Sequence, residues 1–365
     1  MGGRSVFAGV MGAILSVTVA AVASPVVGQT PSTAWPPHFR EGLAPLSGVG
    51  TLPPSSSCAS CHPDEYAQWE RSRHRVAATN AVFTDGLRQE QNVRCANCHA
   101  PIPDGARDLL RTVGPRPLSL PPGSTAHDGV SCAVCHVRDG AILSVGGRGY
   151  GHEHRLTPSL SDPTFCAACH EFRGHNVRDG VTTMNDLPMQ STYSEWQAWT
   201  KATGDTRTCQ TCHMPDGRHD FVGTAPAMLR DALVVVVEHV DGGAEVVLAS
   251  REVGHRSPTG DVFRHLTVHA VVEGQRRELQ RLERRTALVD GPDGPRQVIA
   301  HDTRLVPGEP RRLRLPAGAT AVVVTYHRAD DRAEARGRVS YDELVDELVT
   351  VPVSSDSVRT STAPR

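Results

Sequence analysis

One five-residue pattern, two cysteines separated by two residues and followed by a histidine, occurs five times in this chain of 365 residues. The cysteines are Cys58 and Cys61, Cys95 and Cys98, Cys132 and Cys135, Cys166 and Cys169, and Cys209 and Cys212, and the histidines are His62, His99, His136, His170 and His213. We number these motifs 1 to 5 in chain order. On a short helix, thiols at i and i+3 and an imidazole at i+4 share one face, so they can meet a single porphyrin. The pattern predicts five covalently attached c-type haems.

The cysteine count excludes most other cysteine chemistry. All ten cysteines fall within the five motifs, so none remains for a disulfide or a catalytic nucleophile. Zinc and iron–sulfur proteins also use Cys-x-x-Cys pairs, but tetrahedral zinc ligation does not require a histidine directly after every second cysteine. We therefore expect haem and no zinc.

A haem iron bound by one histidine either takes a second axial ligand or keeps an open position, and this choice separates electron carriers from catalysts. Histidines outside the motifs are the candidate second ligands, and we select His74, His127, His154, His219 and His255. Residues 64–74 read as a helix after Pro63, and the stretch from His62 to His74 would then span about 18 Å. His74 must therefore reach a different haem from the one that His62 binds.

Three of the candidate second ligands, His127, His154 and His219, lie in loop sequences near motifs 3 and 5. His127 precedes Gly129, which permits a sharp turn beside motif 3. His152 and His154 share one glycine-rich loop, so we expect at most one of them to be a ligand and choose His154. His219 follows motif 5 closely.

The amino-acid composition changes along the chain, and this change predicts an α+β fold with two domains. The N-terminal residues combine Arg4, an apolar run and an Ala21-Val22-Ala23 site, which is typical of a secretory signal. Every cysteine lies between 58 and 212. The expected segments are a signal peptide at 1–23, an irregular leader at 24–57, a mainly α-helical or irregular pentahaem domain at 58–225, an all-β sandwich-like domain at 226–352 and a disordered tail at 353–365.

The cysteine-free part contains short valine-rich runs separated by Gly, Pro and Asp, which favour a β-sandwich. These runs lie at 232–240, 245–253, 265–273, 311–318 and 320–329. Residues 340–349 begin like a capped helix, with Ser340 ahead of Glu343. No catalytic pair stands out in this part, so we expect it to cover the last haems, to supply His255 or to bind a partner.

Composition narrows the functional classes. The formal net charge is −2 and no basic tract is present, so nucleic-acid binding has no support. Aromatic residues make up only 4% of the chain, and the porphyrins must then supply the large apolar surfaces that aromatic side chains usually give. The gaps between motifs are too short for five separate cores, so the haems must pack against one another.

Taken together, these motifs resemble the multihaem cytochromes related to the tetrahaem cytochrome c-554 of nitrifiers. Matching segments are CASCHPDEYAQWERSRH at 58–74, DGVSCAVCH at 128–136, FCAACHEF at 165–172, and the stretch from MQSTYSEWQAW to CQTCHMPDGRHDF within 189–221. They cover most of residues 58–225. VGHRSPTG at 253–260 resembles the β-domain that some members carry after the haems.

The resemblance implies distal ligands at three matching positions: His74 in Ser-x-His, His219 before Asp-Phe, and His255 before the Pro-Thr-Gly turn. One departure bears on activity. Pentahaem nitrite reductases carry a catalytic Cys-x-x-Cys-Lys motif, whereas all five motifs here end in histidine and Lys201 is the one lysine of the chain.

These features predict an exported electron carrier with closely packed, mostly bis-histidine haems, in the periplasm or outside the cell, or at a membrane if the signal peptide at 1–23 is not cleaved. The expected partners are redox proteins, either other cytochromes or a membrane quinol-oxidising complex. The alternative is an oxidoreductase in which one haem keeps an open position for a small nitrogen or sulfur oxyanion, bound by arginines such as Arg148, Arg155 or Arg173. We favour the carrier and assign no catalytic residue, because the chain has enough histidines for all five irons.

Overall fold

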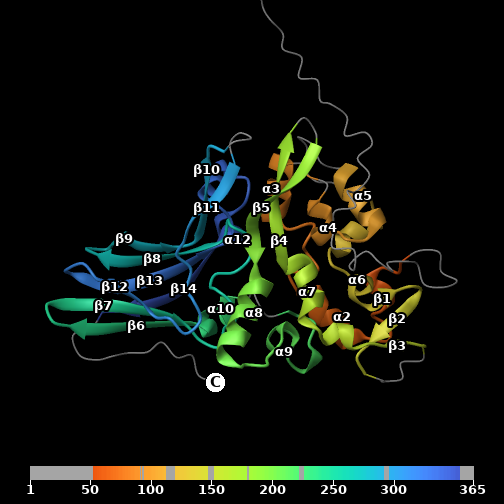
Figure 1. Cartoon of the computed structure of the whole chain (residues 1–365), viewed down its shortest axis with the longest axis horizontal. Coiled ribbons are helices and arrows are strands. Elements are labelled where there is room, and N and C mark those ends of the chain that lie inside the picture. Colours follow the sequence, from red (N-terminus) through yellow and green to blue (C-terminus); the bar gives the residue numbers. More distant parts are fainter. Residues whose placement is uncertain are drawn as a thin grey trace, which may run out of the picture.

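The computed structural model describes residues 52–90, 92, 94–111, 120–146, 152–178, 181–221, 226–291 and 296–353. The predicted signal peptide, most of the leader and nearly all of the tail fall outside these ranges. In Figure 1 the cysteine-rich part, coloured orange to green, lies beside a β-rich part in teal and blue. The predicted mixture of helices and sheets is confirmed, and the division into two domains stays a prediction. No helix in the described ranges is long and apolar enough to cross a bilayer.

Short helices carry four of the five motifs. α4 (Cys95–His99), α6 (Cys132–His136) and α9 (Cys209–His213) consist of the motif alone, and α7 (Pro163–His170) ends on motif 4. Motif 1 forms a turn between η1 (Ser55–Ser57) and α2 (Pro63–Glu70). The remaining elements of this kind are α3 (Ala81–Glu90), α5 (Pro103–Arg111), α8 (Thr192–Thr203), η2 (Thr125–Asp128), η3 (Pro158–Ser161) and η4 (Pro215–Gly217).

Capping residues explain where two motif helices begin. The Asp162 carboxylate accepts a hydrogen bond from the Thr164 N–H at 2.8 Å, ahead of motif 4. The Thr208 hydroxyl accepts one from the Thr211 N–H at 3.2 Å, at the start of motif 5. Each bond satisfies an N–H of the first turn that has no partner within the helix, and so fixes the register of the motif.

The helix predicted over residues 64–74 is too long, because α2 ends at Glu70. The Trp69 indole donates to the Val130 carbonyl at 2.8 Å, and the chain then turns so that the His74 carbonyl accepts from the Val130 N–H at 3.0 Å. Gly129 permits this approach, since a Cβ there would lie 2.4 Å from the His74 oxygen. The turn therefore fixes His74 against the segment that precedes motif 3.

The cysteine-rich part contains more strand than expected. β4 (Glu171–Arg178) and β5 (Val181–Ser191) form an antiparallel hairpin directly after motif 4. β1 (Val137–Arg138), β2 (Ala141–Ser144) and β3 (Arg155–Leu156) form a small sheet after motif 3. The hairpin was missed, although residues 181–183 read Val-Thr-Thr and β-branched residues favour extended backbone.

In the β-rich part, two antiparallel sheets enclose one apolar core, as predicted. One sheet has the strand order β12-β7-β6 and the other β14-β13-β8-β9. Val235, Val246, Val268 and Val324 illustrate how alternate residues of both sheets are almost fully buried between them. The strands are β6 (Leu233–Val240), β7 (Gly243–Ser250), β8 (His265–Val272), β9 (Gln275–Leu282), β12 (Arg311–Arg314), β13 (Ala319–His327) and β14 (Val345–Pro352), with β10 (Arg284–Val289) and β11 (Arg296–Asp302) as a separate hairpin.

The five predicted strand runs correspond to β6, β7, β8, β12 and β13. The predicted helix at 340–349 is wrong beyond its first turn. α12 covers only Tyr341–Leu344, and the chain continues as β14, because pairing with β13 buries Leu348 and Val351 in the core. Two further helices are α10 (Pro226–Ala232) and α11 (Asp331–Arg336).

A buried group of charged residues joins α8 to the β-rich part. The Glu195 carboxylate accepts hydrogen bonds from Arg284 at 2.7 Å and from Arg304 at 2.5 Å, and from the Arg256 N–H at 3.1 Å. Arg304 also pairs with Asp302 at 2.7 Å. Burial alone would raise the pKa of Asp302, but Arg304 and its neighbours hold that pKa below its usual value. This network of buried charges therefore holds the two parts together. Removing one member would leave a buried charge without its partner, which is strongly destabilising.

A second joint lies at α3. Asp85, whose side chain is 1% exposed, accepts two hydrogen bonds from Arg336 at 2.5 and 2.9 Å. Beside it, Ala81 and Val82 pack against a small apolar cluster of the β-rich part that contains Ala333 and Leu344. The β-rich part is therefore held against the cysteine-rich part at two places, α8 and α3.

We predict that Glu195→Ala lowers the free energy of unfolding of the holoprotein by about 3–5 kcal/mol, because it removes the carboxylate that two buried guanidinium groups share and leaves them with one excess buried charge. Those side chains, of Arg284 and Arg304, are only 6% and 4% exposed. Denaturant unfolding measures the change. Glu238→Ala is the matched control, since Glu238 pairs with Arg312 at an exposed position and its loss should cost less than about 1 kcal/mol. Equal losses in the two variants would contradict this account of the joint.

Candidate haem-binding site

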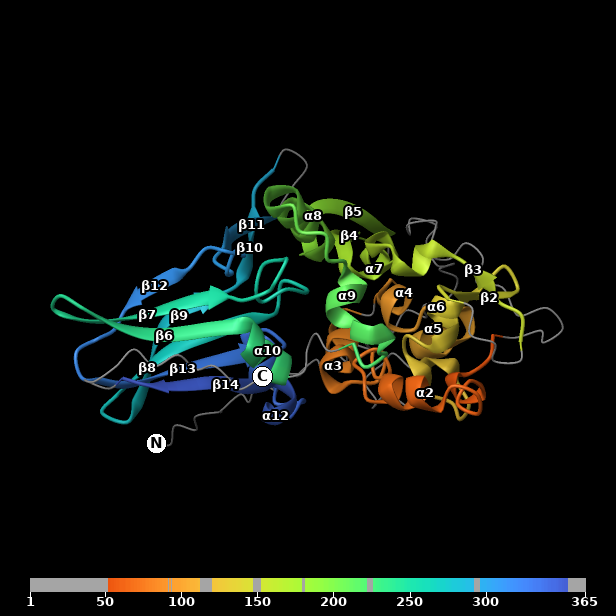
Figure 2. The ribbon, with the colours of Figure 1, turned by 90° about the horizontal axis from the view of Figure 1, so that it is seen from below.

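The five motifs gather in one group. Figure 2 shows α4, α6, α7 and α9 close together. Thiols of different motifs lie near enough to shift one another's pKa in three pairs, Cys58 with Cys132, Cys98 with Cys169, and Cys166 with Cys209. An apolar cluster that includes Val134 and Ala168 also packs against cysteines of motifs 2, 3 and 4. Every motif therefore adjoins at least one other, in a continuous set.

In three motifs the Nδ1 atom of the histidine already has a polar neighbour. His99 Nδ1 lies 2.8 Å from the Ala77 carbonyl and His136 Nδ1 lies 2.9 Å from the Leu143 carbonyl. His170 Nδ1 lies 3.1 Å from the Gln190 side-chain amide. A carbonyl accepts only from a protonated Nδ1, which leaves Nε2 unprotonated in a neutral ring and able to bind a metal. His99 and His136 are therefore in the tautomer that an axial ligand requires.

Four motif histidines each face a second histidine. The ring centroids are 5.9 Å apart for His62 and His152, 6.3 Å for His170 and His74, 6.0 Å for His136 and His219, and 6.3 Å for His213 and His255. Two imidazoles that bind one metal from opposite sides hold their centroids about 6 Å apart, because the metal–nitrogen bond is about 2 Å long and the centroid lies about 1 Å behind the nitrogen. The four spacings fit two axial ligands around one iron.

Burial keeps these imidazoles neutral. It lowers the pKa of His74 and of His213 to about 4 and the pKa of His170 to about 3, and neighbouring histidines add to the effect. Burial also lowers the pKa of His255. A metal binds the neutral ring, so these side chains need lose no proton at neutral pH to become ligands.

The facing histidines outside the motifs lie on turns that the surrounding structure holds in place. The His219 N–H donates to the Gln68 side chain at 2.8 Å. Gly254, next to His255, passes so close to α8 that a Cβ would lie 2.6 Å from the Trp199 ring. The edge of Phe221 packs on His74 with a centroid distance of 4.3 Å. These contacts fix imidazoles that would otherwise sample many orientations on loops.

His99 of motif 2 differs from the other motif histidines. The Phe83 ring stacks on its face, with centroids 3.8 Å apart and planes 9° from parallel. This stacking orients the ring but supplies no ligand. Among the side chains that the structure describes, no second histidine faces His99. Within the described residues, motif 2 is the motif for which no such pair is seen.

The predicted distal ligands have different outcomes. His74, His219 and His255 each lie opposite a motif histidine, whereas His154 does not. It is His152 that faces His62, with His154 edge-on to His152 at 5.6 Å. The geometry favours His152, and two histidines two residues apart in one loop cannot be distinguished from the sequence pattern alone.

His127 stays a predicted ligand, and it is not among the histidines that lie near a motif histidine in the described part of the chain. Its backbone carbonyl accepts a hydrogen bond from Arg75, which helps to fix the turn after His74.

The residues present fit covalently bound haem. Each motif projects two thiols and an imidazole from one turn, and the histidines of motifs 2, 3 and 4 have the Nδ1 partner that metal-binding histidines usually have. When bound, each haem supplies a one-electron iron couple. The chain itself would hold the porphyrins through the motif cysteines and orient the axial imidazoles.

Comparison with known proteins supports the same fold. No protein-family model matches the chain. Among solved structures, a penta-heme cytochrome c552 from Thermochromatium tepidum matches with a TM-score of 0.60 at 20% sequence identity, over 83% of this chain and 99% of that one. At this identity the likeness shows a shared fold. The chain thus has the fold of a multihaem cytochrome c, and a closer relation to cytochrome c-554 stays a prediction.

We predict that His255→Ala converts one low-spin haem to a high-spin state, because it removes the imidazole that faces His213. Magnetic circular dichroism of the oxidised holoprotein measures this change. His154→Ala is the matched control and should leave the spin state of every haem as it was. If His255→Ala also left all spin states unchanged, His255 would not be an axial ligand.

Proposed function

We propose that this protein transfers electrons through five covalently attached haems, four of which take two axial histidines. The observation that carries the proposal is the set of four histidine pairs, each spaced for one iron. An iron with two imidazole ligands has no exchangeable position, so it passes electrons without binding a substrate. Four such haems form a relay.

The contacts between motifs support a continuous path. Motif 1 adjoins motif 3, motif 2 adjoins motif 4, and motif 4 adjoins motif 5. The apolar cluster beside Cys98, Cys135 and Cys169 connects motif 3 to motifs 2 and 4. Motif 1 lies at one end of this set, and its Cys61 is exposed, which makes it the proposed point of exchange with a redox partner.

The proposal includes export to the periplasm or beyond, based on the signal-like residues 1–23, which lie outside the described residues. The proposed partners are other cytochromes or a membrane quinol-oxidising complex. Two propionates on each haem would make the holoprotein acidic, so a partner with a basic docking surface is favoured.

The carrier proposal predicts that fully reduced holoprotein, mixed with an excess of an oxidised small c-type cytochrome, delivers five electrons per molecule. The visible bands of donor and acceptor measure the number delivered. A variant with Cys58→Ala and Cys61→Ala should deliver one electron fewer and react more slowly, because it lacks the haem at the exposed end. A native protein that retains its electrons under these conditions is not a carrier for such partners.

A second candidate function rests on His99. Because no described histidine faces this ring, we propose that the haem of motif 2 keeps an exchangeable position, as an oxidoreductase requires. Reduced holoprotein should then bind one equivalent of carbon monoxide, seen as a change in one haem out of five. Binding of none would mean that all five irons are closed and would leave only the carrier function.

A further inference from the structure

His170 differs from His99 and His136 in the partner of its Nδ1 atom. The other two rings have backbone carbonyls as partners. The partner of His170 is the side-chain amide of Gln190, whose nitrogen lies 3.1 Å from Nδ1 and also 3.1 Å from the Thr192 hydroxyl. A backbone carbonyl can only accept a hydrogen bond, but an amide can turn either its oxygen or its nitrogen to a neighbour. The Nδ1 partner of His170 is therefore adjustable.

Haem attachment decides which atom the amide must present. A neutral imidazole that binds iron through Nε2 carries its proton on Nδ1, so it needs an acceptor there. In the structure the amide nitrogen of Gln190 lies next to His170, and this nitrogen cannot accept the proton. A half-turn of the amide places its oxygen at the same point. The oxygen can then accept from both His170 Nδ1 and the Thr192 hydroxyl.

Thr192 is hydrogen-bonded in turn to the β-rich part. Its hydroxyl lies 2.7 Å from the hydroxyl of Thr259, in the segment between β7 and β8. A threonine hydroxyl has only one proton to donate. If Thr192 donates it to the amide oxygen of Gln190, Thr192 must accept from Thr259. The hydrogen bonds then run in one direction, from Thr259 through Thr192 to the oxygen that also accepts from His170.

The buried charge network at α8 holds both ends of this chain of hydrogen bonds. Arg284 donates at 2.6 Å to the backbone carbonyl two residues before Gln190, whose own side chain is buried. Arg304 donates at 3.4 Å to the carbonyl directly before Thr259. Both arginines also bond to Glu195. The side chains of the chain are therefore fixed relative to one another by the joint between the two parts.

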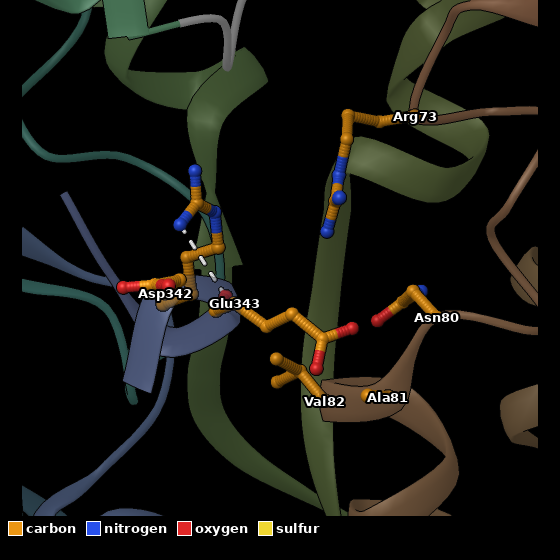
Figure 3. Close-up of a pocket in the computed structure, with 7 residues that line it drawn as sticks. Arg73, Asn80, Ala81, Val82, Asp342 and Glu343 are labelled. Carbon is orange, nitrogen blue, oxygen red and sulfur yellow. Dashed lines mark hydrogen bonds between the residues drawn. The ribbon is translucent and has the colours of Figure 1, made fainter. Parts of the chain in front are cut away.

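The opposite axial side of the same haem also lies at a joint. His74 faces His170, and the residue before it, Arg73, lines a pocket between the two parts of the protein. Figure 3 shows Arg73 and Glu343 reaching into that pocket from opposite walls. The β-rich part thus contacts the surroundings of both histidines of this pair without supplying either of them.

We propose that Gln190 is a positioning residue that turns its amide oxygen to His170 when haem is attached. Thr259, acting through Thr192, sets the strength of that hydrogen bond. The proposal rests on the haem proposed for motif 4. An imidazole that donates from Nδ1 is a more basic ligand, which favours ferric iron and lowers the reduction potential. Thr192 competes for the same oxygen, so it weakens the bond to His170 and raises the potential. The β-rich part thereby adjusts the potential of a haem that it does not ligate.

The test is a spectropotentiometric titration of the full-length holoprotein and its variants. His74→Ala identifies the potential of the haem of motif 4, because it removes the histidine that faces His170. Gln190→Leu removes the acceptor and should raise this potential by about 59 mV, the value of a tenfold change in a one-electron equilibrium. All five haems should remain attached, and the haem of motif 4 should remain low-spin.

Thr259 gives the decisive comparison. Thr259→Val keeps the shape of the side chain and removes the hydroxyl, so Thr192 becomes a weaker donor and the potential should shift by less and in the opposite direction, downward. Thr259→Ser keeps the hydroxyl and should match the native protein. Thr350→Val is the matched control, since the Thr350 hydroxyl donates to Glu347 at an exposed position on β14, and it should leave every potential unchanged.

The outcomes separate this inference from the proposed function. An unchanged potential in Gln190→Leu, or a loss of its low-spin haem, would overturn the role of Gln190. A shift in Gln190→Leu without one in Thr259→Val would overturn the control by the β-rich part. Equal shifts in Thr259→Val and Thr259→Ser would show a packing effect and would overturn it as well. Fewer than five attached haems in the native protein would instead contradict the proposed function.

Discussion

The structure depends on the different roles of the two nitrogens in each motif histidine, one for a hydrogen bond and the other for a metal. A carbonyl or amide near Nδ1 fixes a motif ring, as at His99 and His136, and leaves Nε2 for the metal. A second ring must then stand about 6 Å away on the far side if the iron is to be closed. Loops that come from distant parts of the sequence meet this requirement at four motifs, and their positions are fixed by contacts to neighbouring elements. The absence of such a partner among the described residues distinguishes motif 2 from the others.

The β-rich part does more than cover the haem motifs. It places His255, from the segment between β7 and β8, opposite His213 of motif 5. Glu195 and Asp85 hold that segment's neighbourhood on two sides through buried ion pairs. Such ion pairs fix the relative position of the two parts more than they stabilise the fold, because the cost of desolvating the charges offsets much of their attraction. The joint between the two parts therefore serves mainly to position His255 opposite motif 5.

Several features could be predicted from the sequence because they depend on local chemistry. The five motifs, the valine-rich strands and the histidines His74, His219 and His255 all follow from short patterns. Features that depend on tertiary contacts could not. The polar edge strand β9 has no hydrophobic alternation, β14 begins like a helix, and the choice between His152 and His154 depends on a loop closing onto motif 1.

Electron paramagnetic resonance of the fully oxidised holoprotein, with spin quantitation, tests the central claim most directly. Two imidazole ligands make ferric haem low-spin, while a haem with one imidazole and an open or water-filled position is high-spin. The account predicts four low-spin haems and one high-spin haem per molecule. Five low-spin haems, or more than one high-spin haem, would contradict it.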